Sequence, residues 1–288
     1  MITAKKFLAL SPDQVTSEAE KEFFASLKLR NGTYKTTFQG RFSEINRELR
    51  QLVGSGDITV DHILDIGISS GSNTLELYSA LESAGHKSRI IGTDLMTEAY
   101  LVDVLPGCLA LVDSTGYPLR YDIFKWSMKP WVVRSDYRTC FFIFRKLINI
   151  SLGYRARKII AAANSTRVQK VELVTPMLRK HASIIVKKDD ITRYNRTFDG
   201  KFNFIRAANV LNRGYFTDDD LRTIIYNIKR YLVKPAASLL VMRTHENNDN
   251  HGTLFDIEED GGCRILRRFG KGSEVEDLVL ECMRKKLS

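Results

Sequence analysis

The chain has few of the features that mark disulfide-rich, metal-binding or membrane-spanning proteins. It contains four cysteines in 288 residues, and no two of them stand at CxxC spacing. We expect reduced and mostly buried thiols, because neither a disulfide framework nor a zinc motif is present. No His-x-x-x-His or Cys/His cluster occurs either, so we expect no metal site. The cysteines are Cys108, Cys140, Cys263 and Cys282.

Long apolar stretches are also missing. No run approaches the ~20 apolar residues of a membrane-spanning helix, and the longest candidate, Cys140 to Phe144, is followed directly by two cations. The beginning of the chain turns polar too early for a signal peptide. We therefore expect a cytoplasmic protein. Internal repeats and low-complexity segments are absent, and the length predicts one to two globular domains.

Acidic residues are scarce in one region only. The formal net charge is +10, and residues 120–180 hold 14 Lys and Arg against 3 Asp and Glu. The rest of the chain is near neutral, so the basic character is regional. An excess of this sign favours nucleic acid, anionic lipid, phosphorylated substrates or acidic protein surfaces as partners. The charge alone does not choose among them.

What the sequence does contain is an alternation of short apolar runs and amphipathic segments. Two runs, His62–Ile66 and Arg89–Thr93, predict buried strands, and the segment between them has helical spacing from about Asn73 to Ala84. Strand, helix and strand with short loops form the unit of a parallel sheet. We predict an α/β fold: a Rossmann-like, mainly parallel sheet flanked by helices, with an antiparallel C-terminal edge. Further strands are expected over 183–187, 202–207 and 238–242, and a helix over 218–232 with Thr217 as N-cap. The C-terminal part is expected to form a hairpin over 253–257 and 263–269, with its turn at 260–262, and a last strand over Val275–Cys282.

The chain is expected to have three regions. Residues 1–56 form an N-terminal helical segment, with helical spacing over 18–29 and 42–53, and residues 57–282 form the core. About 90 residues separate Asp94 from Ser183, which is far more than one strand–helix–strand unit needs. We therefore predict a structured insertion over 100–170, after the second core strand. Its expected parts are a small hairpin over 109–112 and 119–123 and a basic helix from Tyr137 to about Ala163.

The stretch from Asp65 to Gly71 lies between a predicted strand and a predicted helix. Glycines there allow a sharp turn and a close approach of a ligand, and the helix points its amides at that ligand. Asp94 ends the next strand, where an acid accepts hydrogen bonds from ribose hydroxyls in nucleotide-binding sheets. The spacing Asp65-x-Gly67-x-x-x-Gly71 has Ser69 where a dinucleotide motif has its middle glycine. A carboxylate at Asp65 suits a cationic amino group better than a pyrophosphate, which favours S-adenosylmethionine (SAM) as ligand.

This stretch resembles motif I of the class I SAM-dependent methyltransferases, departing from it at Ser69. Asp94 in IIGTDL is similar to the family's ribose-binding acid, and Asp190 in IIVKKDDIT to its adenine-contacting acid, with Asp189 as the alternative. Residues 202–211 are similar to the fourth strand and the loop that faces the methyl group, and the resemblance covers about 40–100 and 170–282. It implies SAM as cofactor, with Asp65 at its amino-acid end. The cofactor-binding residues it implies are Asp65, Gly67, Ile68, Ser69, Gly71, Asp94, Leu95, Asp190, Ile191 and Asn209.

A narrower similarity lies in residues 209–216, which resemble the Asn-Val-Leu segment of chemotaxis-receptor (CheR-like) glutamate methyltransferases. The Asn/Asp-Pro-Pro-Tyr motif of amino-group DNA methyltransferases and the Pro-Cys nucleophile of cytosine-C5 enzymes are absent. No motif identifies a catalytic residue. His245 and Glu246 follow the fifth predicted strand and are candidates for a general base or for substrate binding. Tyr215 is a candidate for shaping the pocket, and all three also fit ordinary polar loops.

The basic insertion is the expected determinant of the methyl acceptor. Its interleaved cations and aromatic residues suit an anionic membrane surface, a single-stranded nucleic acid, or a lid with buried aromatics and solvated charges. We expect methyl transfer from SAM to an oxygen or nitrogen of a small or amphiphilic molecule, with peripheral membrane contact through residues 120–180. The alternatives are RNA or protein (carboxylate) methylation, with nucleic acid as a partner in the first case, and a SAM-binding module without turnover. The oligomeric state stays open.

Overall fold

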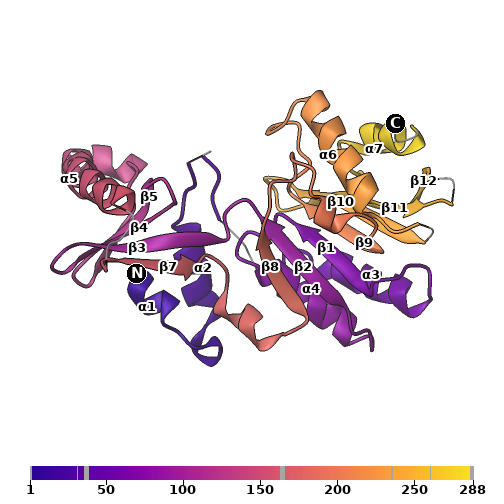
Figure 1. Cartoon of the computed structure of the whole chain (residues 1–288), viewed down its shortest axis with the longest axis horizontal. Helices are drawn as coiled ribbons and strands as arrows, with labels where there is room; N and C mark the ends of the chain where they lie inside the picture. The colour runs from indigo at the N-terminus through magenta and orange to yellow at the C-terminus, as the bar shows by residue number, and fades with distance from the viewer. Residues whose placement is uncertain are drawn as a thin grey trace. The chain divides into compact units, whose positions relative to one another are not determined.

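The chain folds into two compact units in the computed structural model (Figure 1). Unit 1 comprises residues 1–38 and 96–180, and unit 2 comprises residues 39–95 and 181–288. Two positions named in the sequence predictions, Ala163 and Asp260, lie outside the residues that the structure describes. The described residues are 2–30, 32–35, 39–162, 166–234, 236–259 and 261–285.

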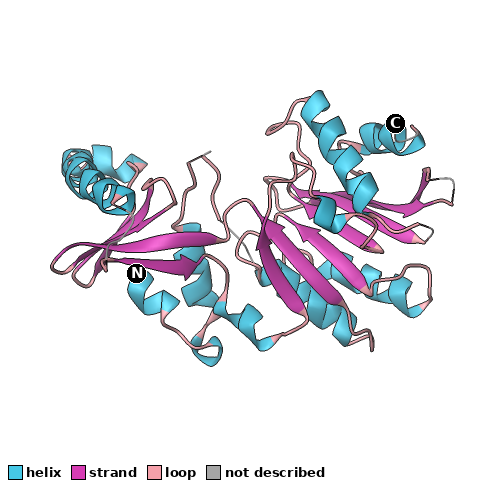
Figure 2. Ribbon diagram, in the orientation of Figure 1, coloured by secondary structure: helices cyan, strands magenta, loops and turns pink. Residues whose placement is uncertain are grey.

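Unit 2 is built around a seven-stranded mixed sheet with the strand order β12-β11-β10-β9-β1-β2-β8 (Figures 1 and 2). The strands from β10 to β8 run parallel, and β11 and β12 add an antiparallel edge. This architecture confirms the predicted fold class. Strands covered on both faces are continuous apolar runs, which is why they were visible in the sequence. The bounds are β1 (His62–Ile66), β2 (Arg89–Asp94), β8 (Ile184–Lys188), β9 (Phe204–Ala208), β10 (Ala237–Thr244), β11 (Asn250–Ile257) and β12 (Cys263–Phe269).

Helices cover both faces of this sheet (Figure 2). Helices α3 and α4 pack together on one face, and α6 and α7 pack together on the other. Helix α6 begins at the predicted N-cap, because the Thr217 hydroxyl oxygen accepts the Asp220 N–H and the Asp220 carboxylate accepts the Thr217 N–H. Its inward side chains, such as Ile225, join Leu239 of β10 in one core. The bounds are α3 (Ser43–Gly54), α4 (Ser72–Glu82), α6 (Asp218–Tyr231) and α7 (Glu276–Arg284), with a short 3-10 helix at Arg196–Phe198.

The predicted last strand, Val275–Cys282, is wrong, because this segment forms most of α7. Its buried apolar side chains recur every three or four residues, which places them on one face of a helix. These side chains are Leu278, Val279, Cys282 and Met283.

Unit 1 is a five-stranded antiparallel sheet with the order β6-β5-β4-β3-β7. The predicted hairpin is confirmed as β4 and β5, and the predicted basic helix as α5. Strands β3, β6 and β7 were not predicted. The strands are β3 (Glu98–Leu105), β4 (Cys108–Val112), β5 (Pro118–Ile123), β6 (Trp126–Met128) and β7 (Val168–Glu172). The helices are α1 (Ala4–Leu8), α2 (Ser17–Ala25) and α5 (Phe141–Ala161), with 3-10 helices at Pro12–Gln14, Arg134–Tyr137 and Pro176–Lys180.

The predicted N-terminal segment is divided between the two units. Phe7 and Phe23, from α1 and α2, share a core with Leu101 and Leu111 of the unit 1 sheet. Helix α3 instead packs on α4 in unit 2. The predicted boundaries at 56 and at 100–170 therefore differ from the observed units. The reason is that helical spacing shows that a face is buried but not which surface buries it.

Candidate functional site

The loop between β1 and α4 contains three left-handed backbone positions. Gly67 has a φ of +75°, Ser69 of +55° and Gly71 of +85°. Glycine adopts such angles freely, whereas for a residue with a Cβ this conformation costs about 1–2 kcal/mol of conformational energy. Ser69 thus replaces a glycine in sequence but keeps the backbone conformation that glycine favours. The loop is held to β2, because the N–H groups of Gly67 and Ile68 both donate to the Thr93 carbonyl oxygen, at 2.7 and 3.0 Å.

Asp94, at the end of β2, also holds this loop. Its Oδ2 accepts the N–H of Ser69 at 2.8 Å. The N–H of Asp189, which follows the neighbouring strand β8, donates to the Asp94 carbonyl oxygen at 3.1 Å. The predicted ribose-binding acid and the glycine loop therefore form one hydrogen-bonded unit at the carboxyl ends of the strands. Ligands bind at this edge in open α/β sheets.

Asp65 is buried and lies in register with Arg206 on the adjacent strand β9. The guanidinium donates twice to the carboxylate, from Nε to Oδ1 at 2.8 Å and from Nη2 to Oδ2 at 2.6 Å. The hydroxyl of Thr74 on α4 also donates to Oδ2, at 2.7 Å. Paired hydrogen bonds of this kind are the strong form of an Arg–carboxylate contact. Donors of the chain itself therefore already engage both oxygens of the carboxylate that the sequence assigned to a cofactor amino group.

Beside this ion pair lie three buried polar atoms for which the described residues supply no hydrogen-bond partner. They are Nη1 of Arg206, Oδ1 of Asn73 and Oε2 of Glu76. Arg206 Nη2 also donates to the Asn73 carbonyl oxygen at 3.1 Å, and the Arg206 guanidinium interacts electrostatically with the Glu76 carboxylate, so the three residues belong to one cluster. Buried polar atoms are nearly always paired, and unpaired ones call for an explanation such as a bound ligand or water. We call these three atoms the buried cluster; it offers one cationic donor and two acceptors.

The segment before α3 contacts Glu76 and Arg206, two of the residues whose atoms form the buried cluster. The Gly40 N–H donates to Oε1 of Glu76 at 2.5 Å, and the Phe42 ring lies 6.0 Å from the Arg206 guanidinium carbon. Burial raises the pKa of the Glu76 carboxyl, and the Gly40 N–H and the charges of Arg206 and Arg41 oppose this shift. Burial also lowers the pKa of the Arg41 guanidinium. Residues 40–42, which the sequence assigned to a separate N-terminal segment, therefore belong to the site.

Replacing Glu76 by glutamine is expected to stabilise the ligand-free protein at neutral pH and to leave it unchanged in acid. A carboxyl whose pKa is raised on folding binds protons more tightly in the folded state. Its contribution to stability is therefore complete below the ordinary pKa of 4.5 and is lost as pH rises through the raised value. The substitution Glu76→Gln removes this loss and keeps an oxygen for the Gly40 N–H.

Urea denaturation of both proteins across about pH 4 to pH 8 measures the effect. Glu82→Gln, at an exposed position of the same helix, is the matched control and should show little difference from the wild type. A variant that loses more stability with rising pH than the wild type does would contradict the assignment of Glu76 to a desolvated position.

The two acids after β8 have different surroundings. Oδ1 of Asp190 accepts the N–H and the hydroxyl of Thr192 at 3.1 and 2.6 Å, so this carboxylate holds a turn. Oδ1 of Asp189 accepts Nδ2 of Asn195 at 2.8 Å. Burial raises the pKa of the Asp189 carboxyl, and the charge of Asp190 adds to this effect. Of the two candidates for the adenine contact, Asp189 is the one whose backbone N–H is hydrogen-bonded to Asp94 at the strand ends.

Asn209 directly follows β9 and has a left-handed φ of +62°. Its N–H donates to the Met242 carbonyl oxygen at 2.8 Å, and its Oδ1 accepts the Thr244 N–H at 2.7 Å, so the residue extends the pairing between the ends of β9 and β10. The next residue, Val210, lies directly over the glycine loop. A Cβ atom on Gly67 would come within 2.2 Å of Val210 Cγ2. The loop after β9 is therefore packed tightly on the loop after β1.

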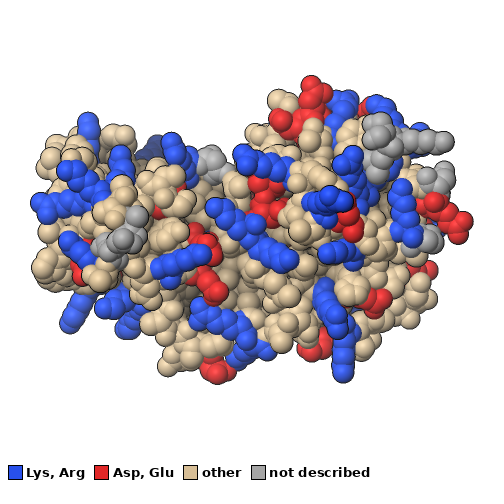
Figure 3. All heavy atoms as spheres, viewed as in Figure 1, with Lys and Arg blue, Asp and Glu red and all other residues tan. Residues whose placement is uncertain are grey.

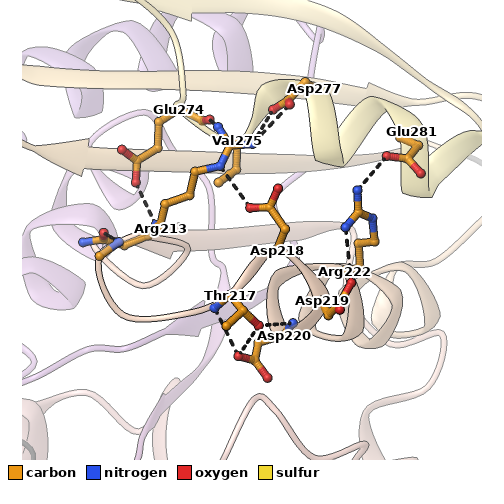
Figure 4. A network of polar contacts seen from close by, with 12 residues as sticks. Arg213, Thr217, Asp218, Asp219, Asp220, Arg222, Glu274, Val275, Asp277 and Glu281 are labelled. Carbon is orange, nitrogen blue, oxygen red and sulfur yellow. Dashed lines mark hydrogen bonds and ion pairs between the residues drawn. The ribbon is translucent and has the colours of Figure 1, made fainter.

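Arg213 anchors the other end of that loop (Figure 4). Its Nη1 donates to the Glu274 carbonyl oxygen at 2.6 Å, its Nη2 lies 3.1 Å from Asp277, and its Nε lies 3.2 Å from Asp218. The Glu274 carboxylate accepts the Arg213 N–H at 3.1 Å and Nη1 of Arg243 at 2.7 Å. Residues 209–216 are thus held by the packing of Val210 and by the ion pairs of Arg213.

The three catalytic candidates lie on two loops and are exposed. Tyr215 is 61% exposed between β9 and α6. His245 and Glu246 are exposed in the turn between β10 and β11, where the His245 ring lies 4.6 Å from that of His251. Both loops follow the carboxyl ends of parallel strands, at the same edge as the glycine loop. The structure thus places the candidates at the expected edge without singling out one of them as a base.

The remaining predicted contacts divide into core and surface. Ile68 and Ile191 are 5% and 9% exposed, and Ile68 packs on Gly92, so both contribute to the core. Leu95, next to Asp94, is 55% exposed. In the described part of the chain, no group of three or more His, Cys, Asp or Glu side chains is arranged to hold a metal ion.

Residue spacing in the sequence did not indicate Arg206 or Glu76 as parts of the site. A usable signal was present in FNFIRAANV, where one arginine interrupts a strand of otherwise apolar residues. A charge inside a buried strand needs a partner, and the adjacent strand carries Asp65 at the same level. Glu76 follows Asn73 by three residues on α4, so both lie on the same face of the first helical turns.

A scan against models of known protein families gives no match, and a search of curated proteins finds no relative. Among solved structures, the N-methyltransferase NodS from Bradyrhizobium japonicum WM9, in complex with S-adenosyl-L-homocysteine, aligns with 72% of this chain and 64% of its own, at 16% identity and a TM-score of 0.32. The CMeT domain of the citrinin polyketide synthase aligns with 71% of this chain and 35% of its own, at 16% identity and a TM-score of 0.35. The PH0226 protein from Pyrococcus horikoshii OT3 aligns with 90% of this chain and 86% of its own, at 12% identity and a TM-score of 0.35. Likenesses of this size assign neither a family nor an activity, and the chain spans less than two-thirds of the length of the first two.

Proposed function

We propose that unit 2 binds SAM at the loop between β1 and α4 and transfers its methyl group to an acceptor. The observation that carries this proposal is the buried cluster of Arg206 Nη1, Asn73 Oδ1 and Glu76 Oε2. The amino-acid end of SAM bears a carboxylate and an ammonium group, which complement one cationic donor and two acceptors. A dinucleotide would place its negative pyrophosphate beside Glu76 and Asp65, where like charges repel. SAM therefore fits the charges of the cluster better.

In this arrangement Arg206 holds the carboxylate of SAM, and Glu76 with Asn73 holds its ammonium group. Asp65 keeps the guanidinium in position and does not contact the cofactor itself, which changes the role suggested by the resemblance. Asp94 accepts hydrogen bonds from the ribose hydroxyls. The adenine contact belongs to one of the two acids after β8, and the proximity of Asp189 to Asp94 supports Asp189.

SAM supplies a methyl group that is already activated on a sulfonium, so the main requirement on the chain is to align the acceptor. A base is needed only where the acceptor loses a proton during attack, and Tyr215, His245 and Glu246 are the residues available at this edge. We propose an oxygen or nitrogen of a small or amphiphilic molecule as acceptor. A SAM-binding module without turnover is the second candidate, supported by the exposure of all three of these side chains.

Calorimetric titration with SAM and with S-adenosylhomocysteine tests the cofactor proposal. We expect both to bind. Glu76→Gln should weaken SAM binding by about 10–100-fold, because a hydrogen bond to a charged group contributes about 1.5–3 kcal/mol. Glu82→Gln on the same helix should bind as the wild type does. Absence of binding by both ligands would rule out the proposed site.

Incubation with radiolabelled SAM and fractionated cell extract identifies the acceptor class. Label in the small-molecule or lipid fraction supports the proposed acceptor, and label in RNA or protein assigns the acceptor to those classes instead. SAM binding without transfer of label to any fraction favours the module without turnover.

A further inference from the structure

Helix α5 of unit 1 is apolar on two opposite faces. One face packs on the sheet, where Leu152 and Ala156 are buried in a core with Val102. The opposite face carries a stripe of large apolar side chains at intervals of four, three and four residues, which brings them onto one line along the helix. We call this line the α5 stripe; it consists of Ile143, Leu147, Ile150 and Tyr154, which are 52%, 60%, 61% and 56% exposed.

Cations border the α5 stripe on both sides. The helix contains five Lys and Arg and no Asp or Glu. Arg145 is buried against Asp136, 2.8 Å away, and does not take part. At 100° per residue, Lys146 and Arg157 lie on one side of the stripe, and Lys158 and Arg155 lie on the other. These four cations are exposed, and Figure 3 shows Lys and Arg side chains gathered over the part of unit 1 that holds α5.

Aromatic rings accompany these cations. Tyr137, which precedes the helix, and Phe144, in its first turn, are 67% and 52% exposed. The Lys158 ammonium lies 4.8 Å from the centre of the Tyr154 ring. An apolar stripe with aromatic residues and a basic border is the pattern of a helix that lies in the plane of a membrane interface. Within the described residues, no helix is both long and apolar enough to cross a membrane.

We propose that the α5 stripe docks unit 1 on an anionic membrane surface, with Ile143, Leu147 and Ile150 entering the headgroup region and the bordering cations contacting lipid phosphates. Charge complementarity selects this occupant, because the helix lacks acids and residues 120–180 hold 14 cations against 3 acids. A single-stranded nucleic acid binds by stacking its bases on aromatic rings, and a line of exposed aliphatic side chains would not contribute to that binding. The inference rests on unit 1 alone and is independent of the proposed methyl transfer.

Vesicle co-sedimentation of the full chain tests this inference. We expect binding to phosphatidylcholine vesicles that contain about a third phosphatidylserine, weaker binding to pure phosphatidylcholine, and loss of binding as salt screens the charges. Reversing Lys146, Arg155 and Lys158 together to glutamate should reduce partitioning by at least about 100-fold, equivalent to about 1 kcal/mol for each cation. Leu147→Glu with Ile150→Glu should abolish it.

Matched controls separate this surface from general charge and apolarity. Reversal of three exposed cations of unit 2, Arg196, Lys201 and Lys271, should leave partitioning unchanged within about twofold, and so should Ile185→Glu, at a single exposed apolar position. Circular dichroism confirms that each variant is folded. Binding that survives both α5 variants overturns the proposal. A second result would also overturn it: the wild-type chain binds no vesicles but self-associates, and Leu147→Glu abolishes the self-association. The α5 stripe would then join two copies of the chain.

Discussion

Replacing Arg206 by leucine is expected to lower the free energy of unfolding by about 3–5 kcal/mol. The side chains of Arg206 and Asp65 are each 2% exposed, and two hydrogen bonds join them. Without the guanidinium, the Asp65 carboxylate stays buried and loses its counter-charge. A buried charge without a partner strongly lowers the free energy of unfolding. Urea denaturation followed by circular dichroism measures the loss.

Two comparisons make this result specific. Arg264→Leu removes an Arg–Asp contact of similar length, 2.8 Å to Asp256, but its side chain is 62% exposed and the expected cost is at most about 1 kcal/mol. The double variant Asp65→Leu with Arg206→Leu removes both charges and should recover much of the stability. A single Arg206 variant that costs no more than the Arg264 variant would show that the pair is not buried in solution. The double variant should still lose SAM binding, because the donor for the carboxylate is gone.

Alanine at position 67 is expected to cost about 2–5 kcal/mol and to abolish SAM binding. Two independent effects add. Gly67 has a φ of +75°, at which a Cβ costs about 1–2 kcal/mol, and that Cβ would come within 2.2 Å of Val210 Cγ2, an overlap that costs about 1–3 kcal/mol more. The loop must therefore move away from β9, and Ile68 and Ser69 lose their hydrogen bonds to β2. Thermal unfolding and calorimetry report the two losses.

The two effects can be separated with matched variants. Gly85 has a φ of +84° and nothing within 4 Å of its Cβ position, so Gly85→Ala should show the backbone cost alone, about 1–2 kcal/mol. Val210→Ala in the Gly67→Ala background removes the clashing methyl group and should recover part of the stability. Equal costs for the alanine variants at 67 and 85 would contradict the close packing of Val210 on the glycine loop.

The sequence by itself determined the core sheet of unit 2. Strands such as β1 were visible because a strand covered on both faces is a continuous apolar run. The start of α6 was visible because an N-cap is a local contact between Thr217 and Asp220. The position of the candidate site was visible because glycines and acids between a strand and a helix mark the carboxyl edge of a parallel sheet. These features depend on residues close together in the chain.

Only the tertiary structure decided what each buried face or charge contacts. It paired Arg206 with Asp65, brought Gly40 to Glu76, and joined α1 and α2 to the sheet of unit 1, and each contact links residues far apart in sequence. The sequence also showed that α5 is both apolar and basic but not which face is covered. The physical reason is shared: periodicity reports that a side chain is buried, whereas its partner depends on how distant elements pack.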